Sequence, residues 1–239
     1  MDLKIVKKVP TNLESIPDAA FYGNPNLTVA VIPYGITIIG DRAFANCSNL
    51  YKVIIPSSVT HIGDNAFKGC SRLSNIQIPP SVIYMGTDAF SGCSSLEEVT
   101  IPFSCKSIKN HTFSGCIGLK FVTIQHGVTH IGEYAFSECP SLISVHIPHT
   151  VTDIDSCAFY NCSGLVAVTL PSSMTTLSWR TFSGCSNLEY VSIPNSLTII
   201  KGQVFNKCDS LINVVIPHSV TSIGGSAFPP GVTLKITDY

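Results

Sequence analysis

Ten cysteines and seven histidines are the side chains of this 239-residue sequence that could bind metal, form disulfides or transfer protons. Cys105 and Cys157 stand alone, whereas the other cysteines recur at one constant spacing, at Cys47, Cys70, Cys93, Cys116, Cys139, Cys162, Cys185 and Cys208. Zinc sites need clustered ligands such as Cys-x-x-Cys, which this sequence lacks. The spacing therefore predicts a ladder of buried thiols acting as small apolar groups, with no metal and no cofactor.

Disulfides between consecutive cysteines remain an alternative on distance alone. Neighbouring parallel strands lie about 4.7 to 4.9 Å apart, which falls within the range of Cα separations that a disulfide accepts. Stacked repeats, however, would hold the Cβ atoms near that spacing, and a disulfide needs about 3.8 Å. The parallel directions of the cysteine side chains therefore favour free thiols over disulfides.

Known catalytic motifs are absent from the sequence. There is no Gly-rich phosphate loop, no nucleophile elbow, no His-Glu-x-x-His and no carboxylate pair at repeated offsets. The sequence predicts no catalytic residue, and we do not expect an enzyme.

The cysteine spacing belongs to a 23-residue repeat that fills most of the chain. Its strongest column consists of phenylalanines, at Phe21, Phe44, Phe67, Phe90, Phe113, Phe136, Phe159, Phe182, Phe205 and Phe228. A period of about 20 to 29 residues with leucine-type positions is typical of leucine-rich solenoids. Equivalent side chains of stacked units should pack in sequence order and form one continuous core.

Each unit divides into two halves. Leu73, Ile76 and Ile78 alternate with polar residues and predict a short strand that ends at Pro79. Residues 63–70 carry apolar side chains at helical spacing and predict one or two turns of helix or 3₁₀ structure. The predicted class is α/β: a right-handed leucine-rich horseshoe with parallel strands on the concave face and short helical segments on the other side.

The repeat resembles that of the BspA-like leucine-rich family. The shared pattern is Ile-Pro-x-Ser-Val-Thr-x-Ile-Gly-x-x-Ala-Phe-x-x-Cys-x-x-Leu-x-x-Val, and it covers about residues 9–228. A single domain over 1–239 is expected, with an N-terminal cap and divergent repeat at 1–31, eight regular repeats at 32–215 and a partial repeat with a cap at 216–239. Both ends carry features expected of caps.

Composition disfavours binding driven by charge. The chain has 14 basic and 15 acidic residues, and 12% of its residues are charged. Without a net field it is not expected to bind nucleic acid. No apolar run reaches the length of a membrane span, and the first residues lack the apolar core of a secretory signal.

A binding surface is expected on the concave face, where strand residues that flank the buried central position point outward. Phe103, Phe121, His126, His146 and His149 form an aromatic and imidazole cluster over the least regular repeats. The candidate ligand-binding residues are these five together with Lys52, Glu98 and Tyr190. Scattered surface aromatics with solvated histidines are one alternative, and a metal site of His126, His146 and His149 is another.

The functional hypothesis is a non-catalytic module that binds a protein or glycan ligand on this face. Resemblance to BspA-like proteins implies surface display and attachment to host proteins or other cells. The missing signal and the many thiols leave a cytoplasmic location open, so an intracellular scaffold of the same fold is the alternative. Neither the ligand nor the oligomeric state follows from the sequence.

Overall fold

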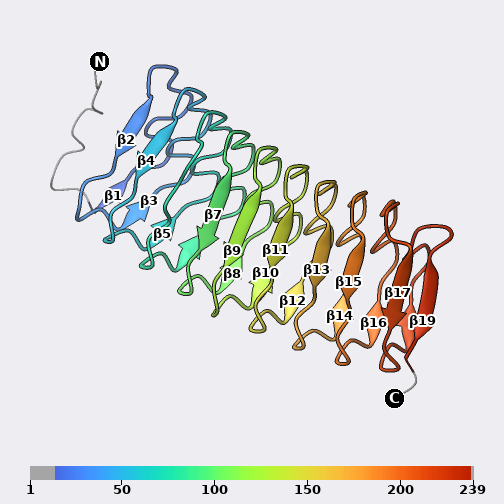
Figure 1. The fold of residues 1–239 in the computed structure, drawn as a ribbon. Coiled ribbons are helices and arrows are strands. Elements are labelled where there is room, and N and C mark those ends of the chain that lie inside the picture. The colour runs from blue at the N-terminus through green and yellow to red at the C-terminus, as the bar shows by residue number, and fades with distance from the viewer. Residues whose placement is uncertain (1–13, 238–239) are drawn as a thin grey trace.

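The computed structural model describes residues 14–237 and shows a stack of coils that runs from one end of the molecule to the other (Figure 1). Residues 1–13 and 238–239, which include parts of both predicted caps, lie outside the described residues. Between 14 and 237 there are nineteen strands and no helix. The fold is a parallel β-solenoid of the leucine-rich repeat type.

All but one of the described coils contribute a strand to what we call the long-strand row. Its strands are β2 (Val29–Val31), β4 (Lys52–Ile54), β7 (Glu98–Ile101), β9 (Phe121–Ile124), β11 (Ser144–His146), β13 (Ala167–Thr169), β15 (Tyr190–Ser192), β17 (Asn213–Ile216) and β19 (Thr233–Ile236). Residues at the same position of successive repeats are paired, as in Val122 with Val99. The 23-residue register is thereby confirmed.

The strand predicted at residues 73–78 is wrong for that coil. There the long-strand row is reduced to single bridges from Asn75 to Lys52 and to Glu98. Pro79 and Pro80 follow at once, and a proline offers no N–H to a ladder. Between β4 and β7 the row therefore continues only through these two bridges.

A second row of two-residue strands was not predicted from the sequence. This short-strand row contains β1 (Ser15–Ile16), β3 (Ile38–Ile39), β5 (His61–Ile62), β6 (Tyr84–Met85), β8 (Ser107–Ile108), β10 (His130–Ile131), β12 (Asp153–Ile154), β14 (Thr176–Leu177), β16 (Ile199–Ile200) and β18 (Ser222–Ile223). It lies beside the long-strand row in Figure 1, and its strands also pair in parallel at equivalent repeat positions.

The predicted helical segment at residues 63–70 is wrong, and with it the α/β class. Asn65, Phe67 and Gly69 donate their N–H groups forward to carbonyls of the next coil, each at 2.8 Å. The residues between them donate back to nearby carbonyls and close turns. Asn65 and Gly69 also have positive φ values of 57° and 71°, which a right-handed helix excludes. Cross-coil pairing thus uses the groups that a helix would need.

The predicted phenylalanine ladder forms the centre of the core. Phe67 stacks on Phe90 and Phe90 on Phe113, with ring centroids 5.3 Å apart in both pairs. The ladder extends in sequence order from Phe21 to Phe228. This confirms that equivalent side chains of successive repeats are spatial neighbours.

The cysteine column lies beside the phenylalanine ladder. All ten cysteines are buried and free. Each thiol of the column donates to the carbonyl oxygen of the phenylalanine in the preceding coil, as Cys70 Sγ does to Phe44 O at 3.1 Å. Burial of these thiols was predicted, but their hydrogen bonds were not. The thiol therefore satisfies a backbone oxygen as well as filling space.

Two polar columns join the coils at their turns. Asp41 Oδ1 accepts the N–H of Asp64 at 2.8 Å, and Gly63 lies close against this carboxylate. Elsewhere the Ser81 hydroxyl donates to Val59 O at 2.6 Å, whereas the equivalent Ser196 Oγ is buried without a partner among the described residues. Cross-coil polar contacts are thus strong in some coils and lost in others.

Candidate binding face

The long-strand row buries and exposes alternate side chains. On β9, Val122 and Ile124 are buried while Phe121 and Thr123 are exposed. The same alternation recurs on β4, β7, β11 and β13. Because these strands keep the same 23-residue register, their exposed residues form files that run along the stack.

All eight predicted ligand-binding residues are exposed, but they do not form one site. Lys52 lies on β4 and Glu98 on β7. Tyr190, on β15, pairs with Ala167 of β13 and lies beyond the small residues Ala167 and Ser144 from Phe121. The remaining predicted residues lie in the central coils: Phe103, Phe121, His126, His146 and His149.

The central cluster is built around two adjacent histidines. The rings of His126 and His149 have centroids 4.9 Å apart, with planes inclined by 44°. Phe121 pairs with Ser144, and His146 of the same strand, β11, pairs with Thr123. Phe121 is 52% exposed and Phe103 is 55% exposed. These accessible rings can contact a ligand through their apolar faces, and the imidazoles can hydrogen-bond to it.

Gln125 shapes the approach to this cluster. Most other coils have proline at this position. The N–H of Gln125 donates to Ile101 O at 3.1 Å, and its side-chain Oε1 accepts the N–H of Phe103 at 3.0 Å. Proline could make neither bond, so this substitution fixes the backbone that carries Phe103.

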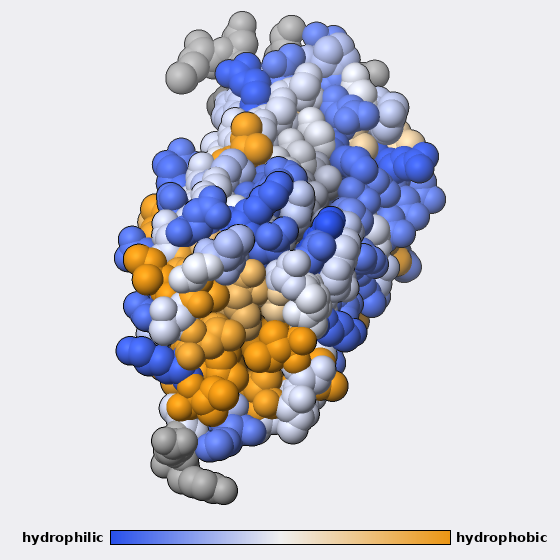
Figure 2. All heavy atoms as spheres, turned by 90° about the vertical axis from the view of Figure 1, so that its right-hand side faces the viewer, coloured by the Kyte–Doolittle hydropathy of each residue, from blue (hydrophilic) through white to orange (hydrophobic). Residues whose placement is uncertain are grey.

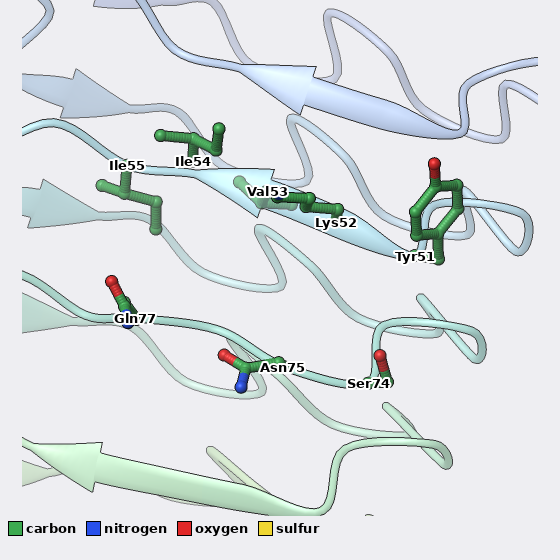
Figure 3. Close-up of a pocket in the computed structure, with 8 residues that line it drawn as sticks. All are labelled: Tyr51, Lys52, Val53, Ile54, Ile55, Ser74, Asn75 and Gln77. Atoms are coloured by element: carbon green, nitrogen blue, oxygen red, sulfur yellow. The ribbon is translucent and has the colours of Figure 1, made fainter. Parts of the chain in front are cut away.

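Lys52 and Glu98 line two adjoining hollows where the row is interrupted. The hollow drawn in Figure 3 has a volume of about 550 Å³ and contains Lys52, Asn75 and Gln77. The second, of about 600 Å³, continues to Glu98 and Gln125. Asn75 and Gln77 project from the same face as Lys52 in Figure 3. The amides could hydrogen-bond to a ligand here.

Asn75 and Gln77 flank the apolar Ile76 and fit the predicted outward pattern, but they are not among the eight predicted binding residues. The hollow depends on the loss of strand pairing around Asn75, and no single residue type predicts that loss. The usable signal was the Pro79-Pro80 pair after the strand, since consecutive prolines remove two ladder donors.

Burial disfavours the thiolate form of the cysteines in the column. Burial raises the pKa of Cys70 and of Cys208 to about 12, and burial also raises the pKa of Cys93 and Cys116 well above the ordinary value. A thiol that keeps its proton is a poor nucleophile and metal ligand. Within residues 14–237 no three or more His, Cys, Asp or Glu side chains are grouped to hold a metal ion.

Comparison with known families identifies the repeat. The model of the BspA type leucine rich repeat region matches in six copies, over residues 14–143 and 129–236. The chain belongs to this family. Across the described residues, this BspA-type protein has no helix able to span a membrane. No match was found among curated proteins.

Solved structures of bacterial leucine-rich repeat proteins resemble this BspA-type chain. A leucine rich cell surface protein from Faecalibacterium prausnitzii is 26% identical with a TM-score of 0.56, and the match covers 93% of this chain and 63% of that one. A leucine-rich repeat protein from Bacteroides ovatus is 25% identical with a TM-score of 0.48, covering 93% and 78% of the two chains. The present chain thus spans less than two thirds of the Faecalibacterium protein.

Proposed function

We propose that this BspA-type protein is a non-catalytic recognition module that binds a protein or glycan ligand on its long-strand row. The observation that carries the proposal is the close approach of the exposed His126 and His149 rings, 4.9 Å apart, in the central coils that also expose Phe103 and Phe121. Exposed aromatic side chains with polar groups nearby suit protein and sugar contacts.

The solenoid supplies a rigid support for such a cluster. Val122 and Val145, which lie between the outward residues of β9 and β11, are 5% and 6% exposed and anchor both strands in the core. A ligand would therefore meet side chains that are already in place. Fixed contact residues lower the ordering cost of binding.

Attachment at a cell surface is the setting that we propose. Its support is the Faecalibacterium relative, which is described as a cell surface protein. The cysteines do not favour an intracellular scaffold instead, because all ten are buried and a buried thiol can stay reduced in either compartment.

A binding screen followed by substitution tests the proposal. The purified chain is applied to an array of immobilised glycans and to an array of purified proteins, and the dissociation constant of each ligand found is measured. Phe121→Ala and His149→Ala should each weaken binding by about tenfold or more while leaving the melting temperature nearly unchanged. Ile83→Ala is the matched control, because Ile83 is 54% exposed but lies outside the long-strand row.

Two outcomes would count against this site. Equal losses of affinity for Ile83→Ala and Phe121→Ala would show a general surface effect. Unchanged affinity in both cluster variants would place the ligand elsewhere, and the hollows at Asn75 and Gln77 would then be tested in the same way.

A further inference from the structure

The C-terminal end of the solenoid leaves core positions uncovered. In the coils before it, the second residue of each short strand is buried: Ile154, Leu177 and Ile200 are 1%, 0% and 0% exposed. The equivalent Ile223 is 45% exposed. Each earlier residue is covered by the coil that follows, and among the described residues no coil follows Ile223.

The last strand extends this open surface. β19 pairs with β17 through a shorter offset than the one that joins the earlier strands, and this sets Leu234 beside Val214 and Ile236 beside Ile216. Val214 and Ile216 are buried. Leu234 and Ile236 therefore belong to the inward-facing files, yet they are 41% and 66% exposed.

Together these residues form an apolar end face. Figure 2 looks onto the C-terminal end and shows hydrophobic side chains gathered over one part of it. The exposed apolar residues of the last coil include Ile223, Leu234 and Ile236. The outer edge of β19 has no paired strand within residues 14–237, so its backbone groups are also available.

We propose that this end face pairs with the same face of a second copy of the chain, with the two β19 strands antiparallel. Within the stack, the equivalent surface of each coil is covered by the next coil, which is apolar and whose strand extends the sheet. The end coil of a second copy presents both features. A two-fold axis brings identical surfaces together, and this is the commonest symmetry of soluble oligomers.

Pairing centred on Leu234 also accommodates the charge on this strand. In an antiparallel pair, directly opposite residues point to the same face of the sheet. If Leu234 lies opposite its copy, Lys235 lies opposite the partner's Thr233 and avoids a second lysine. Lys235 pairs with Val215 within its own chain, on the outward face, so it stays in contact with water.

The dimer would have a consequence for the proposed function, on which this step rests. A two-fold axis that makes strands antiparallel in one sheet is perpendicular to that sheet. Both long-strand rows would then face the same side, and the two binding clusters could engage one surface together. Two linked sites can exceed the affinity of either alone by about 100-fold or more.

The mass of the chain in solution tests the pairing. Light scattering after size exclusion, up to about 100 µM, should give twice the 25.6 kDa of one chain. The combined substitution L234K and I236K should restore the monomer by placing four lysines in the junction. Ile54→Lys is the control, because Ile54 is 45% exposed on β4 near the other end and should leave the dimer intact.

Backbone hydrogen exchange of the wild-type chain gives a second measurement that does not depend on a variant folding. Amides of residues 232–236 should exchange more slowly at dimer concentrations than after dilution, while amides of β4 stay unchanged. A monomer at the highest concentration would overturn the proposal. So would a dimer that survives L234K and I236K, or an assembly that keeps growing with concentration, which indicates head-to-tail contacts.

Discussion

The ring of Phe136 lies parallel to that of Phe159, with centroids 5.4 Å apart and planes 8° apart, and it packs in the same way on Phe113 on its other side. Phe136→Ala removes a fully buried ring from the middle of this ladder. We expect the free energy of unfolding to fall by about 3 to 5 kcal/mol, measured by urea denaturation.

The control for this prediction is Phe121→Ala, which removes the same ring from a half-exposed position on β9. Its cost should be below about 1 kcal/mol. A small effect of Phe136→Ala would contradict the stacking of the rings, because a ring packed on both sides cannot be removed without losing those contacts.

Gly63 is a position where an added methyl group should be poorly tolerated. A Cβ atom there would overlap Asp41 Oδ1 and lie 2.8 Å from the Asp41 nitrogen, breaking the bond that this carboxylate accepts from the next coil. Gly63→Ala should cost about 1 to 3 kcal/mol in thermal or urea unfolding. Gly225→Ala meets no atom within 4 Å and should be neutral or slightly stabilising; equal costs at both sites would refute the steric argument.

Ser81 and Ser196 occupy the same repeat position with different partners. The Ser81 hydroxyl donates to Val59 O, whereas Ser196 Oγ is buried with no partner among the described residues. Ser81→Ala should therefore lower the free energy of unfolding by about 1 kcal/mol. Ser196→Ala should leave it unchanged or raise it, because an unpaired buried hydroxyl is removed. The reverse order, measured by the same urea method, would contradict this difference.

Alkaline pH should destabilise the fold through its buried thiols. Cys70 and Cys208 have an ordinary pKa of 9.0 that burial raises to about 12 in the folded chain. Below pH 9 the thiols are protonated in both the folded and the unfolded chain, so their contribution to the free energy of unfolding is fully present. Between pH 9 and 12 the unfolded chain releases the proton first, so stability falls as pH rises.

Urea unfolding at a series of pH values measures this loss. Cys70→Val should make the decline above pH 9 shallower, because one such thiol is gone. Val82→Ala, a truncation in the same core, should lower stability at every pH without changing the slope. An unchanged slope in Cys70→Val would mean that the thiol is not a source of the pH dependence.

The register of the fold could be predicted because its signal is long and exact in spacing. A phenylalanine that recurs once in every repeat can be buried continuously only if successive coils align, and Phe67, Phe90 and Phe113 do so. The outward position of Phe121 was also predictable, since Val122 beside it is apolar and strand side chains alternate.

The helix was mispredicted because spacing alone does not reveal where backbone N–H groups go. Ala66, Phe67 and Cys70 fit a helical face, but the Phe67 N–H donates to the carbonyl oxygen of Ala89 in the next coil. The sequence did contain one local signal against a helix. Positions equivalent to Gly69 are mostly Gly or Asn, residues suited to positive φ.

The candidate site was less predictable than the fold. His126 and His149 could be placed as neighbours because they share one repeat offset. The hollow beside Asn75 could not, because it arises from strand pairing that fails in one coil. The sequence repeat predicts where strands pair, but it gives little indication of a coil in which that pairing is lost.

The uniform register between coils also bears on how this chain can change in length. Backbone links between successive coils join nearly equivalent repeat positions, so each of these joints has a similar form. Deleting residues 124–146 as a block would bring Phe113 onto Phe159 and recreate a joint of that form. Whole modules could thus be removed, duplicated or exchanged to rearrange the outward side chains, with no new way of packing required.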